Sequence, residues 1–221
     1  MPKVIQIDTY LAIEFEKMGP TIYQYNQPFT LECGVSLPKL KIAYHTYGEY
    51  TPGKKVAWVC HALTANSDAA DWWKGLIGEG YLINPNDYFI VCANIIGSCY
   101  GSTGPLSVED LGTEISLNNF PTVTIRDMVQ AHILLRQHLG IDTIDLLMGG
   151  SMGGYQALEW AIFEPTVIKK MFLISLFFIL LIFNDLSIFL YSGCIGCIGC
   201  AILLSSYLLI NCFYRIPKLL T

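Results

Sequence analysis

Gly149-Gly150-Ser151-Met152-Gly153 is the stretch of sequence that decides the fold. It lies between a strand-like apolar run at residues 143–148 and a helical pattern at residues 155–163. Glycines on both sides of a serine permit a tight strand-to-helix turn that raises the hydroxyl above the sheet. The helix that follows offers backbone N–H groups and its positive dipole end to a developing oxyanion. We therefore predict a nucleophilic Ser151, with a simple helix cap as the alternative.

Two short runs before this turn are largely apolar, namely Lys55–Cys60 and Tyr88–Ala93. Such runs are typical of strands that are covered on both faces. Residues 124–139 form the clearest helix, since Thr124 and Asp127 suit a capping box at its start. Strands that alternate with helices predict an α/β fold with a mostly parallel sheet and helices on both faces.

Three further segments complete the expected fold. Residues 29–33 and Leu40–Tyr47 resemble an antiparallel pair of strands. The segment around Trp72 and Trp73 is a candidate helix, and residues 170–175 are the strand expected after the serine helix.

The loop after Lys55–Cys60 is the expected source of a second oxyanion donor. It reads His61-Ala62-Leu63-Thr64, so the N–H of Leu63 or of a neighbouring residue is our candidate, together with the N–H of Met152. His61 ends a strand and precedes the serine, which favours a role in ordering the loop over a role as the base. Surface or structural roles are expected for the remaining histidines, His45, His132 and His138.

Three motifs, spread over roughly residues 25–175, carry a family resemblance. They are the run from Gly149 to Ala161 (GGSMGGYQALEWA), the run from Cys60 to Thr64 (CHALT), and Tyr88–Ala93 with Asn94, continued by the run from Gly97 to Pro105 (GSCYGSTGP). Together they resemble homoserine O-acetyltransferases, which have the α/β-hydrolase fold. Enzymes that acylate serine or use succinyl-CoA share much of this pattern and stay open as alternatives.

The resemblance implies a ping-pong reaction. Ser151 would take an acetyl group from acetyl-CoA, the co-substrate, and pass it to the hydroxyl of L-homoserine in methionine biosynthesis; no cofactor is implied. Asn94, Tyr100 and Arg126 are the candidate substrate-binding residues, although Arg126 has a surface ion pair as its alternative. A homodimer of the full-length form is a further expectation. Ester or thioester hydrolysis by the same serine is the second hypothesis.

The catalytic pattern expected of this fold is not continued after the helix predicted at residues 155–163. In this fold the triad follows the order Ser, Asp or Glu, then His. The carboxylates that follow Ser151 are Glu159, Glu164 and Asp185, and no histidine occurs in residues 152–221. The resemblance is therefore to the N-terminal part only, and we expect a polypeptide of these residues to lack turnover. A non-enzymatic, membrane-tethered fragment is the third hypothesis.

The composition divides the chain at about residue 175. Residues 1–170 carry nearly all the charge and are typical of a soluble globular protein. The resemblance makes residues 1–175 the N-terminal portion of an α/β-hydrolase catalytic domain, whereas residues 176–221 form an apolar tail. Residues 186–213 carry no charge and are numerous enough to cross a bilayer. The tail could be a membrane segment, a core segment of an unusual domain, or translated non-coding or frame-shifted sequence. The abrupt loss of resemblance favours the last interpretation.

Charge and cysteine content restrict the remaining classes. A net charge of −5 gives no basic patch and argues against a nucleic-acid partner. The first residues lack the apolar core of a signal peptide, which predicts a cytoplasmic protein, with a membrane location only if the tail is genuine. No metal site is expected, including at the Cys194, Cys197 and Cys200 repeat. We expect buried free thiols at the earlier cysteines, Cys33, Cys60, Cys92 and Cys99.

Overall fold

The computed structural model describes residues 19–110, 117–174, 179–183 and 188–191. The strands are β1 (Thr21–Tyr25), β2 (Phe29–Thr30), β3 (Ser36–Leu37), β4 (Leu40–Tyr47), β5 (Lys55–Cys60), β6 (Tyr88–Ala93), β7 (Leu146–Gly150), β8 (Lys170–Ile174), β9 (Ile179–Phe183) and β10 (Ile188–Tyr191). The helices are α1 (Ala69–Trp72), α2 (Ile125–His138) and α3 (Met152–Phe163), with 3-10 turns η1 (Pro105–Asp110) and η2 (Leu117–Asn119).

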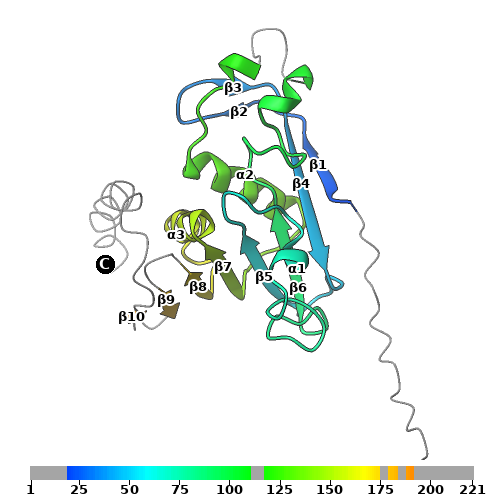
Figure 1. The fold of residues 1–221 in the computed structure, drawn as a ribbon, viewed down its shortest axis with the longest axis vertical. Helices are drawn as coiled ribbons and strands as arrows, with labels where there is room; N and C mark the ends of the chain where they lie inside the picture. Colours follow the sequence, from blue (N-terminus) through cyan, green and yellow to red (C-terminus); the bar gives the residue numbers. More distant parts are fainter. Residues whose placement is uncertain (1–18, 111–116, 175–178, 184–187, 192–221) are drawn as a thin grey trace, which may run out of the picture.

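One twisted sheet organises the molecule, in the order β1-β4-β6-β5-β7-β8-β9-β10 (Figure 1). Its centre is parallel, because β5 pairs with β6 and β7, and β7 pairs with β8, all in the parallel sense. Antiparallel strands flank this centre on both sides. The expected α/β-hydrolase architecture is confirmed, and the sheet continues past residue 175 with β9 and β10.

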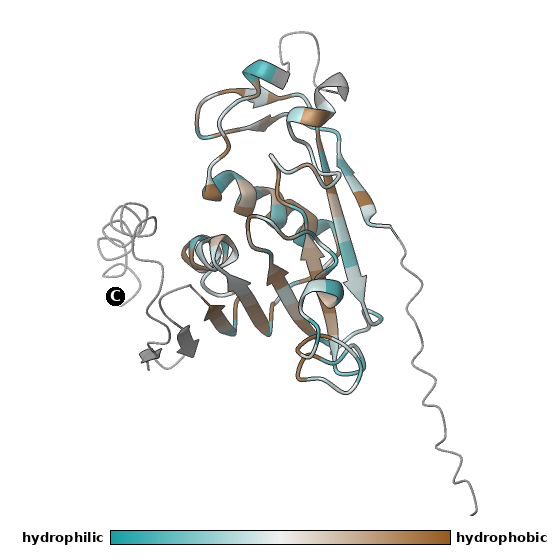
Figure 2. Ribbon diagram, viewed as in Figure 1, coloured by the Kyte–Doolittle hydropathy of each residue, from teal (hydrophilic) through white to brown (hydrophobic). Residues whose placement is uncertain are grey.

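Alternating side chains of β5 enter two cores. Val56, Trp58 and Cys60 belong to the cluster that packs under α2 and α3. Ala57 and Val59 face the other side, where α1 and the loop after it cover them. Both sets are buried, so β5 is apolar on both faces, as Figure 2 shows for the central strands. Helices therefore lie on both faces, as predicted.

The N-terminus of α2 confirms the predicted capping box. The Thr124 side chain accepts a hydrogen bond from the N–H of Asp127, and the Asp127 side chain accepts one from the N–H of Thr124. The same Asp127 carboxylate accepts from the backbone N–H of Glu32 at 2.9 Å. The cap thus also attaches the β2–β3 hairpin to α2.

Three expectations need correction. Residues 29–33 do not pair with β4, because β2 forms a small hairpin with β3, and β4 pairs instead with β1 and β6. The strand expected at residues 143–148 is β7, which runs on to Gly150, and α3 begins at Met152 rather than at Tyr155. Of the four free cysteines, Cys60 and Cys92 are buried as expected, whereas Cys33 and Cys99 are exposed in loops.

Within the described ranges, no helix is long and apolar enough to cross a membrane. The cysteine repeat at Cys194, Cys197 and Cys200, and most of the uncharged run at residues 186–213, lie outside the described residues. The proposed division of the chain at residue 175 stays a prediction.

Candidate active site

The candidate site lies at the carboxyl ends of β5, β6 and β7. Parallel strands bring the loops that follow them to one edge of the sheet, where α/β proteins bind their ligands. The loops are residues 61–68 after β5 and residues 94–104 after β6, and Ser151 follows β7 directly. The candidate site residues therefore lie on loops at one edge of the sheet, with the exception of Arg126.

Ser151 has a strained backbone. Its φ of 53° and ψ of −120° make it the one non-glycine residue with positive φ among the described residues. Such a conformation costs on the order of 1–3 kcal/mol, and the surroundings must hold it in place. The Ser151 N–H donates to the carbonyl of Ile174 in β8 at 2.7 Å, and the Ser151 carbonyl accepts from Gly154 N–H. This is the geometry of a nucleophile elbow.

The two outer glycines of the motif are required by close backbone contacts. A Cβ on Gly149 would lie 2.1 Å from the carbonyl oxygen of Gly153, and one on Gly153 would lie 2.0 Å from the carbonyl oxygen of Cys60. A Cβ on Gly150 or Gly154 would meet only ordinary contacts, at 3.6 Å and 3.5 Å. The turn thus needs glycine where β7 meets the start of α3 and where α3 meets β5.

The two candidate oxyanion donors occupy suitable backbone positions. Met152 is the first residue of α3, where helix N–H groups have no partner within the helix. Leu63 lies in the turn after β5, which a hydrogen bond from Ala65 N–H to the Ala62 carbonyl closes at 3.0 Å. The Leu63 side chain is exposed. Its N–H, together with that of Met152, stays our proposal for the oxyanion donors.

His61 is buried, and both its ring nitrogens have partners. The backbone N–H of Ile95 donates to Nε2 at 3.1 Å, so Nδ1 carries the ring proton and donates to the Ala62 carbonyl at 2.7 Å. Burial lowers the pKa of His61, which favours this neutral form. These bonds tie the loop after β5 to the loop after β6 and leave no free nitrogen to take a proton from Ser151.

Asn94 connects the two loops through hydrogen bonds and is not exposed for substrate binding. Its Nδ2 donates to Ser67 Oγ at 2.9 Å and to the Tyr100 carbonyl at 2.7 Å, and its Oδ1 accepts from Ser67 N–H at 2.7 Å. The side chain is buried. Tyr100 itself is partly exposed, at 40%. Of the two, only Tyr100 has an exposed side chain, and its role in substrate binding stays a proposal.

Arg126 lies away from the turn, in an ion-pair network. Its guanidinium contacts Glu159 at 2.8 Å and Glu32 at 2.9 Å, and it lies 5.4 Å from the centre of the Phe163 ring. Its hydrogen bond to Glu159 raises the pKa of Arg126. Glu159 comes eight residues after Ser151 on α3, about 12 Å along the helix axis. The geometry favours the structural alternative for Arg126.

Replacing Arg126 by methionine tests that assignment. We expect Arg126→Met to lower the free energy of unfolding by about 1 kcal/mol in urea, and this loss to shrink at high salt, because a half-buried ion pair is modest and screened. Lys74→Met is the matched control, since the pair of Lys74 with Asp71 is far more exposed. An unchanged stability for Arg126→Met would contradict the structural role and favour substrate binding by Arg126.

The described carboxylates after Ser151 are engaged elsewhere. Glu159 pairs with Arg126, and Glu164 accepts from Arg136 and from the Trp160 indole, each at 2.8 Å. Both lie on or just after α3, behind the turn. Among the described residues, therefore, no acid or base for Ser151 is identified.

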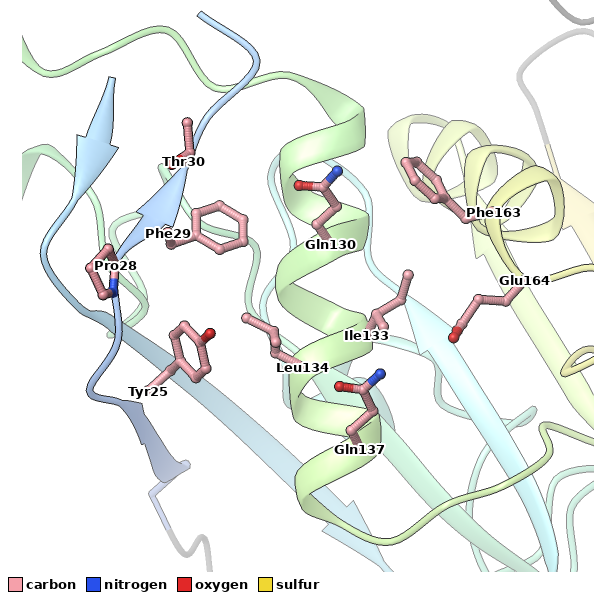
Figure 3. A pocket seen from close by; sticks show the side chains of 10 residues that line it. All are labelled: Tyr25, Pro28, Phe29, Thr30, Gln130, Ile133, Leu134, Gln137, Phe163 and Glu164. Carbon is pink, nitrogen blue, oxygen red and sulfur yellow. The ribbon is translucent and has the colours of Figure 1, made fainter. Parts of the chain in front are cut away.

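A groove of about 410 Å³ lies at the other end of α3. Side chains from the segment after β1, from α2 and from the end of α3 line it, among them Phe29, Leu134 and Phe163 (Figure 3). Ser151 precedes the first residue of α3, whereas Phe163 is the last. The groove is therefore separate from the candidate site.

Comparison with known proteins agrees with this geometry. The family model for the alpha/beta hydrolase fold matches residues 59–189. The chain belongs to this family. It is 52% identical over 139 residues to the homoserine O-acetyltransferase of Chlorobaculum parvum, a match that covers 62% of the chain and 39% of that protein. The homoserine O-acetyltransferase of Chlorobaculum tepidum is 48% identical over 144 residues, covering 65% of the chain and 40% of that protein.

Solved structures give the same fold with two named activities. The homoserine O-acetyltransferase of Staphylococcus aureus superposes with a TM-score of 0.58 at 34% identity, covering 69% of the chain and 46% of that protein. The acetyl esterase MekB has a TM-score of 0.61 at 29% identity, covering 70% of the chain and 43% of that protein. The chain spans about two fifths of the length of the curated relatives that it matches.

Proposed function

We propose that Ser151 is the nucleophile of an acetyl transfer from acetyl-CoA to the hydroxyl of L-homoserine. The observation that carries this proposal is the strained Ser151 at the N-terminus of α3, facing the loop edge of the parallel sheet. The similarity to proteins named homoserine O-acetyltransferase supports the choice of donor and acceptor. Both are proposals for this chain, because it spans only part of those relatives.

The reaction consists of two acyl transfers, one onto the Ser151 oxygen and one from it. The Ser151 hydroxyl loses its proton to a base and attacks the thioester carbon, so that an ester forms and CoA leaves as the thiol. The homoserine hydroxyl then loses its proton to the same base and attacks this ester, so that acetylated homoserine forms and the Ser151 oxygen leaves and takes up the proton from the base. The N–H groups of Met152 and Leu63 would stabilise the oxyanion in both steps. We assign the base to no described side chain.

A labelling assay tests the proposal with imidazole as an added base. With acetyl-CoA and imidazole, we expect one acetyl group on the peptide that contains Ser151, and faster release of that group with homoserine than with water. Ser151→Ala should lose this labelling by about 10³-fold or more. An absence of Ser151-dependent labelling would contradict the proposal, and faster release to serine would contradict the acceptor.

The same assay without imidazole tests the expected inactivity. We expect no turnover above the Ser151→Ala control, because no base in reach of Ser151 is identified. Turnover without imidazole would show that such a base exists, and His61 would be the first residue to replace.

Hydrolysis is the second candidate function. It is favoured by the solved structures named as esterases, which superpose on this chain as well as the acetyltransferases do, with TM-scores of 0.61 and 0.60 for MekB and esterase E22. Acetyl release to water at the rate seen with homoserine would select hydrolysis over transfer.

A further inference from the structure

The start of α3 is joined to the loop after β5 by a side chain outside the GxSxG motif. Gln156, one turn into α3, donates from Nε2 to the carbonyl oxygen of His61 at 3.2 Å. His61 in turn bonds the Ala62 carbonyl and the Ile95 N–H through its ring. These two residues connect α3, the loop after β5 and the loop after β6.

Gln156 makes this connection at a cost to folding. Its side chain is fully buried, and within the described part of the chain its Oε1 has no hydrogen-bond partner. A buried acceptor without a partner destabilises the folded state, and an apolar side chain of the same shape would avoid that loss. The amide therefore fits a positioning task better than a stabilising one.

The segments joined by Gln156 and His61 are the ones that carry the proposed oxyanion donors. Met152 N–H lies at the start of α3, and Leu63 N–H lies two residues after His61. Gly153 packs directly against the Cys60 carbonyl, so α3 touches the end of β5 at this point. Oxyanion donors act only when their separation matches the transition state closely.

We propose that Gln156 and His61 are positioning residues that fix the distance between the Leu63 and Met152 N–H groups. The proposal rests on the proposed acyl transfer at Ser151. Gln156 sets the loop after β5 against α3, and the neutral His61 ring sets the same loop against the loop after β6. Neither side chain touches the acyl group.

Gln156→Met is the decisive variant, since methionine keeps the shape and removes both polar atoms. We expect the midpoint of thermal unfolding to change little, because the removal of the unpartnered Oε1 offsets the loss of the hydrogen bond to the His61 carbonyl. We also expect faster hydrogen exchange at the Ala65 and Ile95 amides, and Ser151 acetylation slowed by about tenfold to a hundredfold. Gln137→Met, at an exposed position of α2, is the matched control and should change none of the three.

His61 is tested by a pair of variants. His61→Gln can keep an acceptor for the Ile95 N–H, whereas His61→Leu cannot, so acetylation should be partly retained in the first and lost in the second. A purely structural role would lower stability and rate together, without this partial rescue.

The exchange measurement separates the two proposals. If wild-type Ser151 is not acetylated, the proposed function fails, but exchange at Ala65 and Ile95 still tests the positioning. Unchanged exchange in Gln156→Met would overturn the positioning role, as would a wild-type acetylation rate in that variant.

Discussion

A Gly153→Ala variant is expected to lose about 4 kcal/mol or more of its free energy of unfolding, or to fail to fold. The added Cβ would lie 2.0 Å from the carbonyl oxygen and 2.7 Å from the carbonyl carbon of Cys60. Both are backbone atoms of the central strand β5, so neither can rotate away. Relief requires that α3 move off the sheet, and Ser151 moves with it.

Gly154→Ala is the matched control, one residue along the same helix. Its Cβ would have 3.5 Å to the nearest atom, and alanine stabilises a helix interior by about 0.5–1 kcal/mol relative to glycine. Chemical denaturation of the two variants gives the comparison, with hydrogen exchange of the β5 amides if Gly153→Ala is too unstable to titrate. Equal stability of the two variants would contradict the packing argument.

The glycines of this turn explain why the end of β7 and the start of α3 were predicted wrongly from the sequence. Gly149 and Gly150 pair in the sheet with Leu173 and Ile174, but glycine has no strand preference that a sequence could reveal. Glycines at positions 153 and 154 likewise obscure the start of a helix. The strands β5 and β6 and the helix α2 were predictable, because apolar runs and a capping box are local signals.

The roles of Asn94 and Arg126 could not be predicted for a different reason. Both residues lie in or just after segments that the sequence predicts to be at the site, but their hydrogen-bond partners are distant in the chain. Ser67 precedes Asn94 by 27 positions, and Glu159 follows Arg126 by 33. Only the fold brings these groups together. Gln156 was also missed, since a single glutamine in an apolar helix gives no signal until its neighbour across the packing interface is known.

The second large effect is expected from His132, as a loss of stability in acid. His132 is buried on α2, between Trp58 and Trp160, with ring centres 6.0 Å away in each case. Within the described residues neither of its ring nitrogens has a hydrogen-bond partner. Burial first, and then the charge of His61, lower the pKa of His132 from 6.5 to about 3.

The sign of the effect follows from this direction. Between pH 6.5 and 3 the unfolded chain binds a proton at His132 that the folded chain excludes, so the free energy of unfolding falls as the pH falls. One such group contributes a slope of about 1.4 kcal/mol per pH unit, or about 2 kcal/mol by pH 5. Burial also lowers the pKa of His61, which adds a loss of the same sign.

His132→Phe isolates the contribution of this one ring. Phenylalanine suits the aromatic surroundings and removes both unpartnered nitrogens, so we expect equal or higher stability at pH 7. Between pH 6.5 and 4.5 the slope of unfolding free energy against pH should fall by about 1.4 kcal/mol per pH unit, which corresponds to one bound proton. Urea denaturation at each pH measures this slope. Gln137→Met, at an exposed position of the same helix, replaces a side chain that does not titrate and should leave the slope unchanged. If His132→Phe keeps the wild-type slope, His132 is not the buried neutral group that its surroundings require, and a proton partner must reach it in the folded state.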